Sequence, residues 1–137
     1  MTRINVVPVY ELSIPHLLAE YRELKHIFTR KIDTVDAPET YCLGKGHVKF
    51  GRKHSTFILR RYKQICEEML YRGLTVNHPY EEILNLYIKI ESKNKNDYFP
   101  TQEDLQLNRE RIIQRLKLQP KFYYWGNRKY PEYFKHL

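Results

Sequence analysis

The residues with the clearest chemical potential stand at the start of the chain, where Met1 is followed by the small residue Thr2. Removal of Met1 would leave a free α-amino group on Thr2. The pKa of an α-amino group is about 7.7 to 8.0, whereas that of a lysine amine is about 10.4, so roughly a tenth of the terminus is unprotonated at neutral pH. Such an amine can attack an electrophilic carbon and form a Schiff base. Thr2 is therefore a candidate nucleophile, although many chains begin with Met-Thr and lack this chemistry.

A carboxylate that can assist such an amine, Glu23, falls in the helix predicted next, from about residue 14 to residue 31. Ser13 can cap this helix, and Pro15 is tolerated in its first turn, where a backbone N–H would have no partner. At about 100° per residue the apolar side chains form one stripe, which we expect to be core. The polar side carries His16, Glu23, His26 and Arg30. A solvated, salt-bridged face is the commoner explanation of such a pattern.

Length and charge limit the class of protein. A chain of 137 residues suits one domain with a single core, so we treat residues 1–137 as one unit. The formal net charge of +8 favours a polyanionic partner, and nucleic acid is the commonest one. Charge alone does not distinguish DNA from RNA.

The sequence also carries information on membrane segments and on cysteine pairing. No apolar run approaches the roughly 18 to 20 residues of a membrane span, and the N-terminus lacks a signal peptide's apolar region. Cys42 and Cys66 form neither a Cys-x-x-Cys pair nor a disulfide framework, which suits a reducing compartment. We therefore expect a cytoplasmic monomer, nucleoid-associated or in the host cytoplasm if viral. It should have no membrane partner and no metal or disulfide requirement for folding.

The remaining pattern predicts an all-α fold. Residues 1–12 are mixed in character and contain Pro8, so we expect an extended arm lying across the helices. Two more main helices are predicted at about 56–72 and 101–118, the second with N-cap chemistry at Thr101. Residues 122–134 form the most aromatic stretch. The expected architecture is a single compact domain of three main helices with an extended N-terminal arm and an aromatic C-terminal tail.

Some side-chain placements follow from the same periodicity. The stripe of the second helix, expected in the core, comprises Ile58, Tyr62, Ile65 and Met69. Ser55 is a possible cap, and Arg60, Arg61 and Lys63 lie off the stripe, as in an ordinary solvated face. In the tail, two interpretations stay open for Phe122, Trp125 and Phe134: they close the core, or they stack on bases. The run Gly44-Lys45-Gly46-His47 can let the backbone approach a phosphate, but a tight turn with surface lysines explains it as well.

Several blocks, in chain order, resemble one known family. The first is Met1-Thr2-Arg3-Ile4-Asn5, followed by His16-Leu17 and by Ala19-Glu20-Tyr21-Arg22-Glu23-Leu24. Downstream, residues 43–50 read Leu-Gly-Lys-Gly-His-Val-Lys-Phe, Arg72-Gly73 closes a helix, and Asp97-Tyr98-x-Pro100 precedes the last helix and its aromatic tail. These blocks resemble the phage endonuclease V family, the pyrimidine-dimer DNA glycosylases with apurinic-site lyase activity.

The resemblance implies a bifunctional DNA glycosylase and lyase that needs neither metal nor organic cofactor. Its partner would be double-stranded DNA with UV damage or abasic sites, in which unstacking a base costs least at a lesion. The Thr2 amine would attack C1′ of the 5′ pyrimidine of a cyclobutane dimer. Glu23 would stabilise the imine's positive charge and assist the β-elimination that nicks the strand.

The same resemblance, together with the charge pattern, implies a set of DNA-binding residues. Arginines four residues apart on the last helix share a face and can each bind a phosphate. Tail aromatics beside cations suit stacking on unpaired bases. The expected set is Arg3, His16, Arg22, His26, Arg30, Lys45, Arg111, Arg115, Tyr123 and Tyr124.

The sequence departs from the family at a few of these positions. His26 stands where the phage enzyme has an arginine, so this contact should be mostly uncharged at pH 7, and DNA binding should strengthen as pH falls. Pro15 replaces a polar residue, and the aromatic run is shorter and differently ordered. These departures affect lesion specificity more than chemistry.

Other functions stay open at this point. A related glycosylase for another lesion, or chiefly a lyase for abasic sites, would share the same residues. A non-catalytic basic DNA- or RNA-binding module would show steep salt dependence without strand scission. A metal-dependent nuclease using His47 and His54 is disfavoured because these histidines lack a recognised ligand spacing with a carboxylate.

Overall fold

The computed structural model describes residues 4–134, a range that contains helices and loops and no β-strand. The helices are α1 (Ile14–Leu24), α2 (His26–Thr29), α3 (His47–Lys53), α4 (Ser55–Tyr71), α5 (Tyr80–Ile88) and α6 (Gln102–Leu118). Three 3-10 turns join them: η1 (Val9–Glu11), η2 (Ser92–Asn94) and η3 (Glu132–Phe134). The fold is an all-α single domain, as expected.

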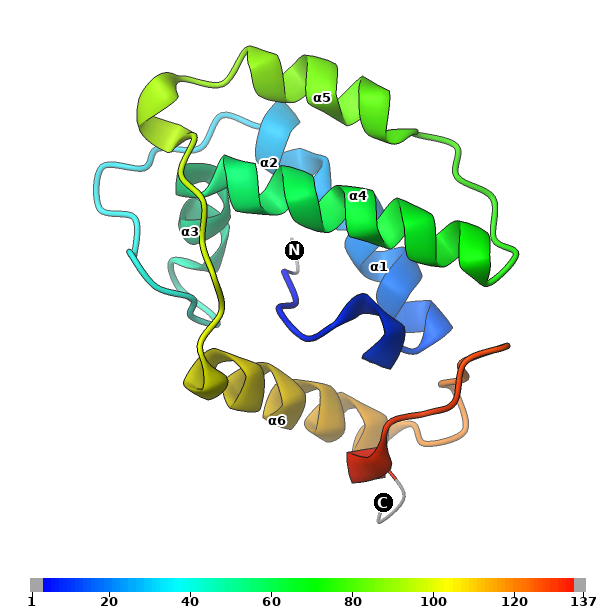
Figure 1. Ribbon diagram of the computed structural model, residues 1–137. Helices are drawn as coiled ribbons and strands as arrows, with labels where there is room; N and C mark the ends of the chain where they lie inside the picture. The colour runs from blue at the N-terminus through cyan, green and yellow to red at the C-terminus, as the bar shows by residue number, and fades with distance from the viewer. Residues whose placement is uncertain (1–3, 135–137) are drawn as a thin grey trace.

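Helix α4 lies at the centre of the fold. It packs against α1, α3 and α5, and its apolar stripe is buried as the periodicity predicted. Figure 1 shows α5 along one side of α4, α1 and α2 behind it, and α6 below. The N-terminal segment passes between α4 and α6, so α6 reaches the other helices largely through this segment.

The ends of α1 and α6 follow their capping residues. Ser13 Oγ accepts a hydrogen bond from the His16 backbone N–H at 3.2 Å, and a proline occupies the first turn of α1. At α6, Thr101 and Asp104 form a capping box in which each side chain accepts from the other's backbone N–H, at 3.1 and 2.9 Å. Both starts could be read from the sequence because caps are local interactions.

Other boundaries differ from the expectation. The helix predicted over 14–31 is interrupted at Lys25, where the Thr29 hydroxyl donates to the Lys25 carbonyl, a bond of the kind that bends helices. Ser55 is the first residue of α4 and not its cap, because its hydroxyl donates to the Asn94 carbonyl at 2.6 Å. Helix α3 was not expected. It starts after Gly46, whose φ of 91° favours glycine, and a Cβ atom added at this position would lie 2.9 Å from Pro38 Cγ.

Candidate active site

The N-terminal arm, residues 4–7, is buried between the helices and is held by hydrogen bonds at its first described residue. The Ile4 backbone N–H donates to His47 Nε2 at 2.8 Å, and the Ile4 carbonyl accepts from the Tyr41 hydroxyl at 2.7 Å. His47 Nδ1 lies 2.7 Å from the Cys42 carbonyl, so the ring is neutral with its proton on Nδ1. Thr2 and Arg3 lie outside the described residues. The described part of the arm therefore begins at a residue whose backbone groups are both fixed, Ile4.

A buried ion pair lies under the arm. Glu20 of α1 is 0 % exposed and Arg61 of α4 is 4 % exposed. The guanidinium of Arg61 binds the carboxylate through two bonds, Nε to Oε2 at 2.9 Å and Nη2 to Oε1 at 3.0 Å, and it also donates to the Val7 carbonyl. Asn5 Nδ2 donates to Glu20 Oε1 at 3.0 Å. The pair is stable in the interior because its remaining hydrogen-bonding positions bind the arm.

Asn108 of α6 fastens the arm from the other side. Its Oδ1 accepts from the backbone N–H groups of Val6 and Val7 at 2.7 and 3.1 Å, and its Nδ2 donates to Asn5 Oδ1 at 2.9 Å. Arg61 was expected on a solvated face and is buried instead. Neither Asn108 nor Glu20 was singled out from the sequence. Asparagine is disfavoured in mid-helix because its side chain competes for backbone hydrogen bonds, and this was the available signal for Asn108.

Glu23, the candidate catalytic carboxylate, shares a face of α1 with the residues under the arm. His16, Glu20 and Glu23 follow one another at spacings of four and three, which places them on one stripe of a helix. The Glu23 side chain is 28 % exposed, and its Oε2 lies 3.3 Å from Nδ1 of His26. Within residues 4–134 neither of these two atoms makes a hydrogen bond. Glu23 is thus a half-buried carboxylate whose Oε2 is shielded from solvent and faces a histidine nitrogen.

His16 is covered by the C-terminal tail. It was expected on the polar, solvent-facing side, but it is only 5 % exposed. Its Nδ1 lies 2.8 Å from Ser13 Oγ, and its ring stacks on Tyr123 with centroids 4.7 Å apart and 7° between the planes. The Tyr124 carbonyl accepts from the Ile14 backbone N–H at 2.7 Å, while the Tyr124 side chain stays exposed. One ring face of Tyr123 is therefore occupied by His16.

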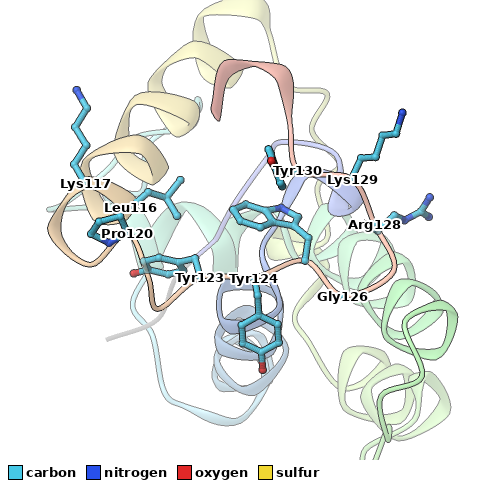
Figure 2. A pocket seen from close by; sticks show the side chains of 10 residues that line it. Leu116, Lys117, Pro120, Tyr123, Tyr124, Gly126, Arg128, Lys129 and Tyr130 are labelled. Atoms are coloured by element: carbon cyan, nitrogen blue, oxygen red, sulfur yellow. The ribbon is translucent and has the colours of Figure 1, made fainter. Parts of the chain in front are cut away.

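The tail and the end of α6 enclose a cavity of about 810 Å³ (Figure 2). Its walls combine aromatic rings with cations: Leu116, Lys117, Pro120, Tyr123, Tyr124, Trp125, Gly126, Arg128, Lys129 and Tyr130. Trp125 is buried, and its indole N–H donates to the Glu11 carbonyl at 3.0 Å. Of the two alternatives for this residue, core closure is therefore the one that the structure shows. Phe122 is exposed and does not close the core, and the Phe134 side chain lies outside the described residues.

The expected cationic contacts are spread over several elements. Arg22, Arg30 and Lys45 are exposed on α1, after α2 and before α3. Arg22 also lines a smaller cavity of about 420 Å³, formed between α1 and the α4–α5 loop. Arg111 and Arg115 are half-buried on α6, and Arg115 Nε is buried without a hydrogen-bond partner among residues 4–134. The structure thus brings His16 to Tyr123 and Glu23 to His26, and leaves Arg30 and Lys45 on separate loops.

Electrostatics keep the arm's histidine anchor neutral. Burial lowers the pKa of His47 below its ordinary value and outweighs the hydrogen bond to the Cys42 carbonyl and the charge of Glu20, which both raise it. A proton on Nε2 would face the Ile4 N–H, so the hydrogen bond requires the neutral ring. The lowered pKa and the hydrogen bond therefore both support the neutral ring, and the hydrogen bonds place its proton on Nδ1.

Both ring nitrogens of His47 are committed to backbone hydrogen bonds, and His54 Nδ1 lies 2.8 Å from the Phe50 carbonyl. Within the described range, no three His, Cys, Asp or Glu side chains gather as a metal site would require. No helix between residues 4 and 134 is long and apolar enough to cross a membrane. The two histidines thus serve the packing of α3 and the arm.

The half-buried carboxylate beside a fastened N-terminal arm, on a protein of net charge +8, defines a candidate enzyme for a polyanionic substrate. Residues 1–82 match the family model described as pyrimidine dimer DNA glycosylase. The match covers more than half of the chain, and the chain belongs to this family of DNA-repair glycosylases. Its substrate is accordingly DNA. Helix α6 and the tail lie outside the matched residues.

Proposed function

We propose that the chain is a pyrimidine-dimer DNA glycosylase with AP lyase activity that uses the Thr2 α-amine as its nucleophile. The amine attacks C1′ of the 5′ pyrimidine nucleotide, the glycosidic bond breaks, and loss of the ring-oxygen bond leaves an imine between Thr2 and the open sugar. Removal of a C2′ proton then breaks the C3′–O bond and releases the 3′ phosphate. Water finally hydrolyses the imine and frees the enzyme.

In this proposal Glu23 acts on the sugar and the imine. Its carboxylate stabilises the positive charge of the imine and moves protons during the sugar opening and the β-elimination. The observation that supports this role is the position of Glu23, half-buried on the α1 face that also anchors the arm through Glu20 and Asn5. A fixed arm is needed because a nucleophile that is misplaced by about 1 Å loses much of its rate.

The DNA contacts of the proposal follow from charge and ring exposure. Arg3, His16 and Arg22 hold phosphates and sugar near the lesion. The further contacts to the DNA backbone are His26, Arg30, Lys45, Arg111 and Arg115, and Tyr123 and Tyr124 contact DNA from the tail. Phosphate contacts position the duplex, whereas the selection of damage comes from the lower cost of displacing a damaged nucleotide. We propose that the protein acts as a monomer on UV-damaged or abasic duplex DNA.

Borohydride trapping tests this proposal directly. Duplexes with a single thymine dimer or a single abasic site are incubated with the protein in EDTA and reduced, and the adduct is mapped by mass spectrometry. We expect a covalent adduct at Thr2 on both duplexes from protein that lacks Met1. An adduct on the abasic duplex alone would keep the lyase and assign the glycosylase to another lesion. No adduct on either would leave a DNA-binding protein without this chemistry.

Two variants locate the chemistry. Thr2→Ala should still form the adduct, because the α-amine survives, whereas protein that retains Met1 or has a blocked terminus should not. Glu23→Gln should lower nicking by about 100-fold or more, the range for loss of a general acid–base group, with DNA affinity unchanged. Full activity with Met1 retained would contradict the proposal.

A further inference from the structure

Glu68 of α4 lies at a junction between the two ends of the chain. It is only 5 % exposed, and its carboxylate binds two arginines. Arg72 Nε donates to Glu68 Oε2 at 2.7 Å. Arg128 donates through two guanidinium nitrogens, Nε to Oε2 and Nη2 to Oε1, each at 2.9 Å. Burial raises the pKa of Glu68, but the hydrogen bonds and charges of Arg128 and Arg72 outweigh it and lower the pKa overall. The carboxylate is therefore charged at neutral pH.

Arg72 and Arg128 link Glu68 to two different segments of the chain. Arg72 Nη2 lies 3.2 Å from the Val9 carbonyl and 3.3 Å from the Tyr10 carbonyl, where the arm leads into α1. Arg128 belongs to the tail, and its guanidinium carbon lies 3.9 Å from the centroid of the Tyr71 ring at the end of α4. The next residue back, Asn127, donates from Nδ2 to the Tyr71 carbonyl at 2.9 Å. Figure 1 shows the orange and red tail on the side of the molecule where α4 ends.

We propose that Glu68 is a positioning residue that fastens both ends of the chain to α4, and that Arg128 holds the aromatic tail in place through it. The part of this inference that concerns DNA rests on the proposed function, whereas the docking of the tail does not. The residues from Tyr123 to Arg128 then form one rigid strap, tied to α1 by the Tyr123–His16 stack and to α4 by Arg128.

The geometry explains why Arg128 in particular matters. The tail lies outside the residues that match the family, whereas Glu68 and Tyr71, to which Arg128 attaches it, lie within them. Only a guanidinium can bind both oxygens of Glu68 while stacking flat on a tyrosine ring; a lysine has one point charge and no planar face. If the strap presents Tyr124 to the substrate, loosening it weakens substrate binding while the chemical step at Thr2 and Glu23 continues.

The single tryptophan of the chain, Trp125, reports the docking of the tail directly. It is buried three residues before Arg128, and its indole N–H donates to the Glu11 carbonyl. The experiment compares the wild type with Arg128→Ala and Arg128→Lys. Lys93→Ala is the matched control, because it removes one positive charge from an exposed side chain on η2, away from the tail. Circular dichroism checks that all four proteins are folded.

We expect the fluorescence of Trp125 to shift to longer wavelength, and its quenching by acrylamide to rise, in both Arg128 variants and not in the control. With abasic duplex DNA, KM should rise about tenfold in both variants, as for the loss of one stacking contact, while kcat for imine formation stays within about twofold. Arg128→Lys keeps the net charge of the protein. It therefore separates the effect of losing the attachment of the tail from the effect of losing a positive charge.

Three outcomes would overturn the inference: an unchanged Trp125 signal in Arg128→Ala, an exposed Trp125 with unchanged KM, or an Arg128→Lys protein that behaves as the wild type. The last would make Arg128 a simple phosphate contact. If the wild type forms no adduct on either damaged duplex, the proposed function fails. The Trp125 signal then still decides whether Arg128 docks the tail.

Discussion

The two ends of the chain are both non-helical segments laid against α1, but they are held in different ways. The N-terminal arm is buried: Ile4 and Val7 are almost inaccessible, and their backbone groups bond to His47, Tyr41 and Arg61. Among the tail side chains that the structure describes, Trp125 is the buried ring, and the main ion pair of the tail uses the half-exposed Arg128. The arm is part of the core, whereas the tail is a surface layer.

This difference fits two separate roles, support of the nucleophile by the arm and contact with bases by the tail. A nucleophile at the start of the chain needs a rigid support, because reacting atoms must be aligned to a fraction of an ångström. Aromatic rings that stack on displaced bases tolerate some freedom, since stacking is not strongly directional. Changes in the arm's supports should therefore reduce stability, and changes in the tail's exposed rings should reduce binding. The following tests can break or sharpen this contrast.

The largest effect should come from Arg61→Ala. It leaves the Glu20 carboxylate buried without its partner and the Val7 carbonyl without its donor. Removing one member of a buried pair costs about 3 to 5 kcal/mol of unfolding free energy. Urea unfolding measures the loss. Lys63→Ala, an exposed cation on the same helix, is the control and should change stability by less than about 0.5 kcal/mol. Equal effects of the two variants would mean that the arm is not a core element.

Asn108→Ala should have the second largest effect. The backbone N–H groups of Val6 and Val7 lose their acceptor and Asn5 Oδ1 loses its donor, and each unsatisfied buried group costs about 1 to 3 kcal/mol. Water entering the space would reduce the sum, so we expect a loss of about 2 kcal/mol in the same assay. Gln114→Ala, an exposed amide on α6, should leave the unfolding midpoint unchanged. If imine trapping is also measured, its rate should fall with Asn108→Ala alone.

Acidification should weaken the arm's anchor by a smaller amount. The pKa of His47 is lowered in the folded protein, chiefly by burial, and that of His54 is lowered for the same reason. The unfolded state therefore takes up more protons as pH falls below about 6.5, and stability present above that pH is lost on the acid side. Urea midpoints from pH 8 to pH 5 measure this loss. His47→Gln should flatten the curve, and the exposed His78→Gln should not; a midpoint that is constant over this range would contradict the assignment.

Tyr124→Ala should have the smallest effect on stability and a clear effect on binding. The ring is exposed, so its removal should change the unfolding free energy by less than about 0.5 kcal/mol. Affinity for damaged duplex should fall about fivefold or more, as expected for a lost stacking contact. Phe99→Ala, an exposed ring in the loop before α6, is the control and should alter neither quantity. A loss of stability without a loss of affinity would place Tyr124 with the arm, as part of the core.

The sequence alone determined much of the helical framework. The caps at Ser13 and Thr101 act within one turn, and the stripe from Ile58 to Met69 repeats at the helical period, so both could be read locally. The family was also readable, because its first block is specific in type and order and the family match confirms it. Glu23 as the catalytic carboxylate remains a prediction from that resemblance.

Only the tertiary structure decided which polar residues are buried. Periodicity places Arg61 and His16 on polar faces, yet each meets a partner from elsewhere in the chain. Arg61 binds Glu20, which is 41 residues away, and His16 stacks on Tyr123 of the tail. A polar side chain becomes part of the core when a distant partner satisfies its hydrogen bonds, and a local pattern carries no record of that partner. The same reason separates Trp125, which meets the Glu11 carbonyl and is buried, from Phe122, which remains exposed.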